Sequence, residues 1–102
     1  EGQLRLERER LVAALDAARI RVESSRIQLA AAEKRARLAQ ESRGFFEKSF
    51  RMGETDLPTR LRIELEASEA ERQDARARID LAAAVSAYRQ ALGLLPEQGT
   101  QQ

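Results

Sequence analysis

The sequence predicts an all-α fold, a long antiparallel two-helix coiled-coil hairpin, from three observations. Apolar residues recur at alternating steps of three and four along most of the 102 residues, which is the spacing of a coiled-coil seam. Charged residues make up 34% of the chain and aromatic residues only 4%, and Ala, Glu, Arg and Leu dominate, as in long helices. The pattern is interrupted between Met52 and Pro58, and so short a connection requires two helices to fold back on each other.

The first helix is expected over residues 3–51 and carries two apolar seams. The first seam is Leu4, Leu11, Leu15, Ala18, Val22, Ser25, Leu29, Ala32, Ala36, Ala39, Phe46 and Phe50. The second seam, nearly opposite, is Leu6, Ala13, Ala17, Ile20, Ser24, Ile27, Ala31, Leu38 and Phe45. A pair of helices needs one seam, so the second predicts a neighbour on each side of the helix, as for a stave in a wall. Ala enrichment for helix propensity is the simpler alternative, but it does not account for the Leu, Ile and Phe residues.

The second helix is expected over residues 58–93, after a tip at residues 52–57. Asp56 is a suitable cap, Pro58 is tolerated in the first turn, and Gly93 followed by Pro96 marks the end. Its first seam is Leu61, Leu65, Ser68, Ala75, Ile79 and Ala82. Its second seam is Ile63, Ala67, Ala70, Ala77, Leu81, Ala84, Tyr88, Ala91 and Leu95. The hairpin domain therefore spans residues 1–96, and residues 97–102 form a polar tail.

Pairing the two first seams predicts the contacts of the hairpin. Phe46 would face Leu65, and Ala32 would face Ile79, so that a large side chain meets a smaller one in most layers. Such alternation is what dense packing requires.

The charges and the missing residue types exclude several functions. The net charge is +1, from 18 basic and 17 acidic residues that are interspersed, whereas a nucleic-acid interface needs clustered Lys and Arg. The chain has no Cys and no His, which removes thiolate chemistry and the commonest metal ligand and general base. Pairs such as Glu33 with Arg37, or Asp74 with Arg78, are spaced to support a helix surface. We therefore expect no enzyme activity, no catalytic or metal-binding residue and no cofactor.

The sequence also lacks an apolar run of about 18 residues, so we expect no membrane-spanning helix. It begins without an initiator Met or a signal peptide, which indicates a processed or excised piece of a larger protein.

The tip combines Phe50-x-x-Gly53 with Thr55-Asp56-Leu57. A helix that stops at Gly and restarts at a polar cap explains these residues structurally. The functional alternative is a docking point, because loops on rigid scaffolds are favoured binding positions.

The segment from Phe50 to Pro96 resembles the hairpin of TolC-type outer-membrane efflux proteins, and the C-terminal of their repeats in particular. Those repeats carry an aromatic residue, two further residues and Gly at the tip, then Ala at roughly heptad intervals and a final Ala-Leu-Gly. The matching residues are Phe50, Gly53, Leu57, Leu61, Ala70, Ala77, Ala84, Ala91, Leu92 and Gly93. The resemblance covers about half of the chain, and the first helix matches only in character.

The resemblance implies a homotrimer in which an outer-membrane β-barrel continues into a periplasmic helical tunnel, of a Gram-negative cell, with such hairpins as its wall. It implies that Met52, Gly53, Glu54 and Thr55 bind a periplasmic adaptor protein, and that an inner-membrane pump completes the export system. Membrane contact would be made only by segments absent from this chain. Phe50 is a gate candidate where the family often has Tyr. The acidic gate residues of some members are missing, because Thr59 and Arg62 stand at those positions.

Two other functions remain open from the sequence. One is the hairpin of the periplasmic adaptor (membrane fusion) protein itself, which also has a Gly-containing tip. The other is a purely structural or dimerisation coiled coil. The segments flanking the hairpin in the full-length gene product would distinguish these, since a duct has amphipathic strands there and an adaptor has lipoyl halves.

Overall fold

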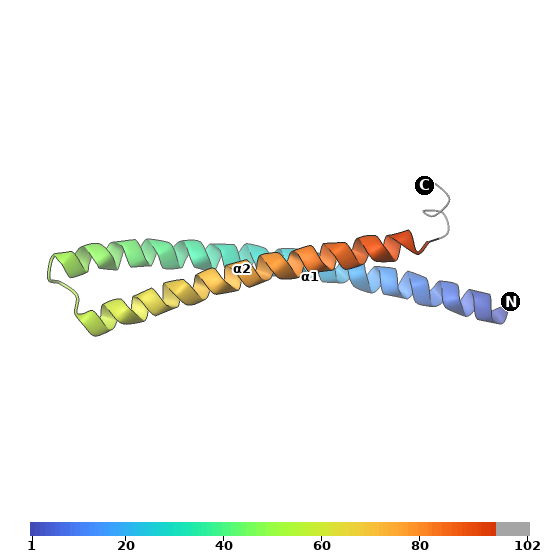
Figure 1. The fold of residues 1–102 in the computed structure, drawn as a ribbon, viewed down its shortest axis with the longest axis horizontal. Coiled ribbons are helices and arrows are strands. Elements are labelled where there is room, and N and C mark those ends of the chain that lie inside the picture. Colours follow the sequence, from blue (N-terminus) through green and yellow to red (C-terminus); the bar gives the residue numbers. More distant parts are fainter. Residues whose placement is uncertain (96–102) are drawn as a thin grey trace. The chain divides into compact units, whose positions relative to one another are not determined.

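The structure is a computed structural model that describes residues 1–95, and its two helices are α1 (Gly2–Arg51) and α2 (Leu57–Gly93) (Figure 1). The all-α class and the helical hairpin are therefore confirmed. Each helix begins one residue earlier than predicted and ends at the predicted residue. The predicted tail at residues 97–102 lies outside the described residues. The chain divides into two compact units, residues 28–78 and residues 1–27 with 79–102, which we call the tip unit and the terminal unit.

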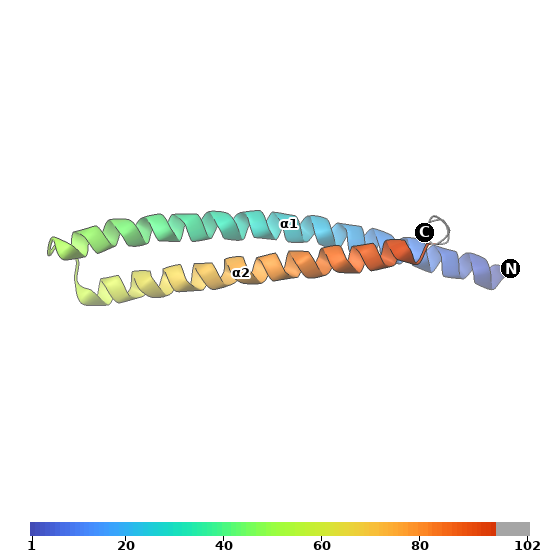
Figure 2. The same ribbon diagram turned by 45° about the horizontal axis from the view of Figure 1, so that its top comes forward.

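In the tip unit, residues 28–51 of α1 lie antiparallel to the first part of α2, to which the short loop joins them (Figures 1 and 2). The buried apolar residues here are Ala32, Ile63, Ala67 and Ala70. Three of the four are Ala, and small side chains at a helix contact allow the two backbones to approach closely. The core of this unit is therefore a thin layer of small residues.

In the terminal unit, the buried residues are Val22, Ser25 and Ala84. Leu11, Leu15 and Tyr88 are half-buried and continue the same heptad positions. Residues 1–10 are all exposed.

The face that α1 turns inward is the predicted first seam. From Leu11 to Phe50 every residue of that seam is buried or half-buried, and every residue of the second seam is exposed.

The face that α2 turns inward is the second of its predicted seams, so the predicted seam pairing is wrong for this helix. Leu61, Leu65 and Ile79 of the first seam are 55%, 68% and 69% exposed. Ile63 and Ala67 of the second seam are buried. Phe46 with Leu65 and Ala32 with Ile79 are consequently not seam contacts.

Electrostatics and close approach explain why α2 is turned this way. Both seams of α2 have heptad spacing, so periodicity alone does not select one. Burying Ile63, Ala67 and Ala70 places Glu64 and Glu71 beside Arg43 of α1, which itself occupies a position in the α1 seam. The predicted register, in which Phe46 faces Leu65, would set Arg43 three residues further from the tip against Ser68. A charged group at a helix contact is stabilised by partners of opposite sign, and the observed orientation supplies two of them.

The alignment of the two helices along their axes agrees with the prediction. Arg78 binds Glu33 and Gln40 binds Glu71 across the tip unit. Gln40 is six residues before Phe46, and Glu71 is six residues after Leu65, so this pair lies at the level that the predicted register assigns. The predicted alignment of the two helices along their axes is therefore right, and the predicted rotation of α2 about its own axis is wrong.

Candidate functional site: the hairpin tip

The end of α1 is a Schellman turn built around Gly53. The amide N–H of Glu54 donates to the Ser49 carbonyl at 2.9 Å, and that of Gly53 donates to the Phe50 carbonyl at 3.0 Å. These are the two hydrogen bonds that define the motif. Gly53 has φ +77°, a conformation that costs residues with a Cβ free energy. A Cβ at Gly53 would meet no atom within 4 Å, so the turn requires Gly for its backbone conformation and not for space.

The start of α2 is capped by Asp56. The amide N–H of Thr59 donates to Asp56 Oδ1 at 3.0 Å, and that of Arg60 donates to the Asp56 carbonyl at 3.2 Å. This is the geometry of an N-cap, in which a side-chain oxygen satisfies an otherwise unpaired helix N–H. Hydrogen bonds from the Thr59 side chain and backbone lower the pKa of the Asp56 carboxyl below its ordinary value of 3.8. Pro58 lies in the first turn, where its missing N–H costs nothing.

Phe50 contacts α2 through its ring. The guanidinium carbon of Arg60 lies 4.6 Å from the ring centroid, within the range of a cation–π interaction, and both side chains are half-buried. Arg60 is not among the tip residues that the sequence predicts. It lies three residues before Ile63 and so extends the buried seam of α2 toward the tip. That spacing is the feature of the sequence from which its place at the helix contact could have been predicted.

The four predicted adaptor-binding residues lie together in the turn between the helices. Met52, Gly53 and Glu54 are exposed, and Thr55 is half-buried. Met52 is the one large apolar side chain among them, and Arg51 beside it is paired with Glu47 at 3.0 Å. The turn therefore offers one flexible apolar side chain, one carboxylate and an exposed backbone. Their role in binding stays a prediction, as does the role of Phe50 as a gate.

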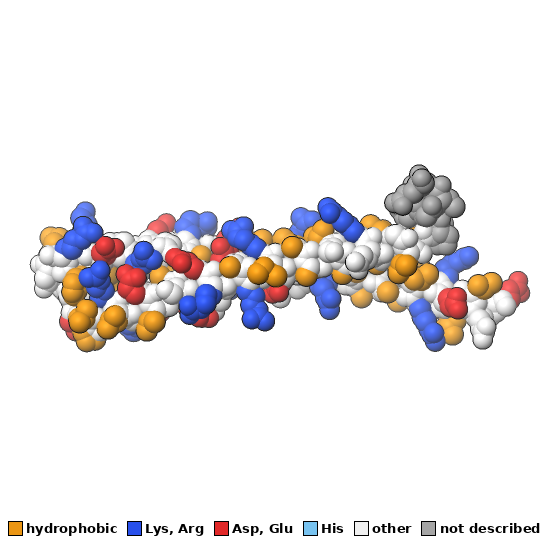
Figure 3. Space-filling model, viewed as in Figure 1, with side chains coloured by type: hydrophobic (Ala, Val, Ile, Leu, Met, Phe, Trp, Pro, Cys, Tyr) orange, Lys and Arg blue, Asp and Glu red, His pale blue; other side chains and the backbone are white. Residues whose placement is uncertain are grey.

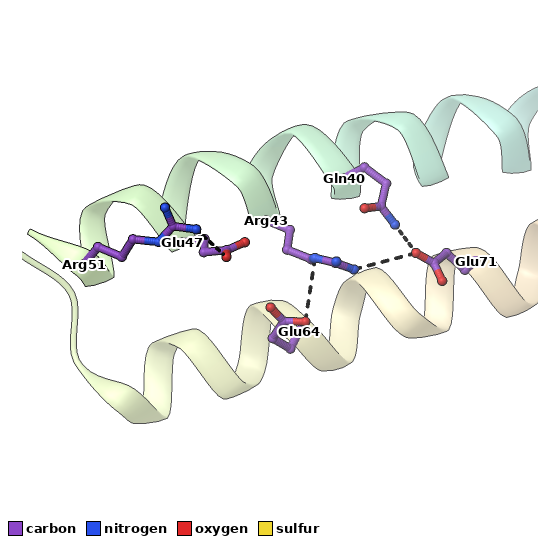
Figure 4. Close-up of polar contacts among 6 residues, drawn as sticks. All are labelled: Gln40, Arg43, Glu47, Arg51, Glu64 and Glu71. Carbon is purple, nitrogen blue, oxygen red and sulfur yellow. Dashed lines mark hydrogen bonds and ion pairs between the residues drawn. The ribbon is translucent and has the colours of Figure 1, made fainter.

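A polar cluster joins the two helices further from the loop (Figure 4). Arg43 reaches from α1 to α2 with its Nε 3.7 Å from Glu64 Oε2 and its Nη1 3.8 Å from Glu71 Oε1. Gln40 donates a hydrogen bond to the same Glu71 carboxylate. This cluster is not predicted from the sequence, because a contact between two helices depends on the rotation of each helix about its own axis.

A second polar group forms around Arg78. Its Nη2 lies 2.9 Å from Glu33 Oε2 on α1 and 3.4 Å from Asp74 Oδ2 on its own helix. The predicted pair of Asp74 with Arg78 is thus present. Glu33, expected to pair with Arg37, pairs across the helices with Arg78 instead.

The face of the molecule drawn in Figure 3 carries charges of both signs with hydrophobic side chains between them. Exposed pairs such as Arg62 with Glu66 and Arg72 with Glu69 lie within one helix. The Arg72 guanidinium donates hydrogen bonds to Glu69 and lowers the pKa of that carboxyl. Pairs of this kind contribute little to stability, typically about 0–1 kcal/mol.

Two open depressions lie on α1, one lined by Glu1, Gly2 and Arg5 and the other by Glu7, Arg10, Leu11 and Ala14. Among residues 1–95, no three Asp or Glu side chains converge on a point where a metal ion would be held. Neither helix, within the same residues, has a segment with the length and hydropathy of a membrane span.

Comparisons with known proteins give no family. No family model matches the chain, and neither a curated protein nor a solved structure matches it.

Proposed function

We propose that this chain is the periplasmic coiled-coil hairpin of an outer-membrane efflux duct of a Gram-negative cell. The hairpin is one stave of the tunnel wall, in a full-length protein that forms a homotrimer. Its tip docks on a periplasmic adaptor protein, which joins the duct to an inner-membrane pump in a tripartite export system.

The observation that carries this proposal is that each helix keeps an apolar stripe exposed when the two helices pair. On α1 the large exposed members are Leu6, Ile20, Ile27, Leu38 and Phe45. On α2 they are Leu61, Leu65 and Ile79. Scattered surface Leu residues need no explanation, but a stripe at heptad spacing on each helix is a second seam. A hairpin that has neighbours on both sides would bury both stripes, and a wall of such hairpins supplies those neighbours.

The order of features along the chain supports the same function. The aromatic residue, Gly and restart cap of the tip are followed by the Ala repeats of α2 and the Ala-Leu-Gly end. Ala70 and Ala84, which match the family pattern, are buried in the hairpin. The matched Ala positions thus belong to the contact between the two helices, and the outer stripes are left for neighbours.

A structural or dimerisation coiled coil is the rival function that the stripes also fit. A tight dimer of the isolated chain, with its outer stripes buried against each other, would support that rival. Weak association of the isolated chain at high concentration is the expectation for a duct hairpin, because its stripes are mostly Ala with scattered larger residues. Sedimentation over a range of concentrations distinguishes the two.

The wall contact is tested by placing a charge on either stripe. Leu38→Glu and Leu65→Glu alter exposed side chains, so the free energy of unfolding of the isolated chain should change by no more than about 0.5 kcal/mol. In the full-length protein each substitution should lower the amount of trimer, because the charge would be buried against a neighbouring hairpin. Arg62→Glu, on the same part of α2, is the matched control. Undiminished trimer in both stripe variants would exclude the wall role.

The docking role is tested at Gly53. Gly53→Val places a β-branched residue at a positive φ and should destabilise the turn by about 1 kcal/mol or more, while the helices beyond the first turn survive. In the full-length protein it should abolish export and leave the trimer intact, as measured by drug or metal tolerance and by trimer abundance.

Gly53→Asn is the companion variant, because Asn tolerates positive φ and preserves the turn. Restored export with Asn would assign the defect to the strained turn. Normal export with Val would remove the tip from the functional site.

A further inference from the structure

The contact between Phe50 and Arg60 lies where the two helices meet the loop. Phe50 is in the last turn of α1 and Arg60 is in the first turns of α2. The Arg60 guanidinium covers the Phe50 ring at 4.6 Å from its centroid. The ion pairs of Arg43 are the next polar side-chain contacts between the helices among residues 1–95, about two helical turns away along α1.

Both residues are also tied to the backbone of the turn. The Phe50 carbonyl accepts the Gly53 N–H at 3.0 Å, one of the two hydrogen bonds of the Schellman turn. The Arg60 N–H donates to the carbonyl of Asp56, the residue that caps α2. The ring and the guanidinium therefore connect the last turn of α1 to the capped first turn of α2, and only residues 52–56 lie between those two anchored ends.

We propose that Phe50 and Arg60 form a clasp that fixes the geometry of the Met52–Thr55 turn, and that both are positioning residues for the docking of a partner at the tip. The docking part rests on the function proposed above, whereas the clasp itself is a property of this chain. Such a clasp fixes the distance between the two helix ends. It thereby also fixes the direction in which the backbone of Gly53 and Glu54 faces outward. A turn held in its bound geometry loses less conformational freedom on binding.

The chemistry of the pair favours this role. A guanidinium is planar and stacks on an aromatic face, whereas an ammonium is a compact, strongly hydrated charge. Arg60 has no ion-pair partner among residues 1–95, while Arg51 and Arg62 nearby are each paired with a Glu on their own helix. The Phe50 ring is thus the partner of Arg60, and one face of that ring is already occupied.

The test measures hydrogen exchange with water at the two backbone amides whose hydrogen bonds close the turn. Water-exchange NMR on the intact chain reports the opening of the hydrogen bonds made by Gly53 and Glu54. Phe50→Leu and Arg60→Ala should each speed exchange of these amides by about two- to five-fold, the effect of an exposed cation–π contact. Phe50→Tyr should restore slow exchange, and Arg60→Lys should restore it only in part. The amides of residues 15–25 in the terminal unit are the internal control.

The double variant decides whether the two side chains act together. If they form a clasp, Phe50→Leu combined with Arg60→Ala should speed exchange no more than the larger single effect. If the two single increases in exchange rate multiply in the double variant, the clasp is overturned. It is also overturned if neither single variant changes the exchange rate.

The same variants in the full-length protein separate the clasp from the proposed function. Weaker adaptor binding by Phe50→Leu and Arg60→Ala, with normal binding by Phe50→Tyr, supports the positioning role. Faster amide exchange with undiminished binding and export leaves the clasp standing and overturns its role in docking. Passive leakage through the duct without any change in exchange would make Phe50 a gate and overturn the clasp.

Discussion

The tip unit and the terminal unit are held by different kinds of contact along the same two helices. In the tip unit, Arg43 and Arg78 of opposite helices each reach acidic residues across the seam, and Arg60 reaches Phe50. In the described part of the terminal unit, the ion pair observed is that of Asp16 with Arg19 within α1. Its seam is formed by uncharged residues, of which Val22, Ser25 and Ala84 are buried.

The difference teaches what fixes the alignment of two helices. An apolar heptad seam repeats every seven residues, so a slip by one heptad again pairs apolar with apolar. A charge in the seam distinguishes these alignments, because Arg43 lies between Glu64 and Glu71 in the observed one, and a slip by one heptad would leave it only one of the two. The tip unit therefore contains the contacts that favour one alignment of its two helices over its neighbours. Polar groups at a few seam positions are a known means of specifying register.

The largest expected effect comes from enlarging the buried Ala residues. Ala67→Leu in the tip unit and Ala84→Leu in the terminal unit overfill a closely packed seam, at a cost of about 1–3 kcal/mol. Ala67→Leu should cost more, because the ion pairs prevent the helices from shifting to admit the larger side chain. Urea denaturation of each variant measures the difference, and Ala75→Leu on the exposed side of α2 is the control. Equal costs in the two units would show that the ion pairs do not pin the helices.

A smaller effect is expected from removing the charge in the seam. Arg43→Ala leaves Glu64 and Glu71 without their shared partner and should lower the free energy of unfolding by about 1 kcal/mol or less, since these side chains are 39–54% exposed. The loss should shrink in 1 M NaCl, where screening weakens the wild-type pairs.

The matched control for this charge is Arg62→Ala, which breaks an exposed pair within α2 and should cost only a few tenths of a kcal/mol. A loss at Arg43 that matches the loss at Arg62, in low and high salt alike, would contradict a special role for the seam charge.

The smallest effect concerns the pH dependence of the α2 cap. The pKa of Asp56 is lowered by its hydrogen bonds with Thr59, so the folded cap favours the ionised carboxylate. The stability it gives is complete above the unfolded pKa of 3.8 and is lost as the pH falls through the lower folded value. NMR of the Thr59 amide should show the first turn of α2 fraying below about pH 3.8. Asp56→Asn keeps a capping oxygen without the titration and should abolish this pH dependence.

The sequence by itself determined the class of fold and the places where the helices end. Heptad spacing identifies two long helices, and the positive φ at Gly53 and the cap at Asp56 follow from residue types that favour those conformations locally. The axial alignment also followed, because a short loop leaves two antiparallel helices little freedom to slide. The helix ends and the cap depend on neighbouring residues, and the axial alignment depends on the length of the loop. Both can therefore be predicted directly from the sequence.

Only the tertiary structure decided which face of α2 is buried and which charges meet. Both faces of α2 carry apolar residues at the same spacing, so burial of Ile63 and exposure of Leu65 depend on the rotation of one helix against the other. The pairing of Glu33 with Arg78, the cluster at Arg43 and the contact of Arg60 with Phe50 all follow from that rotation. The physical reason is that a rotation is selected by the sum of close packing and charge pairing over the whole contact, and no single segment of sequence contains that sum.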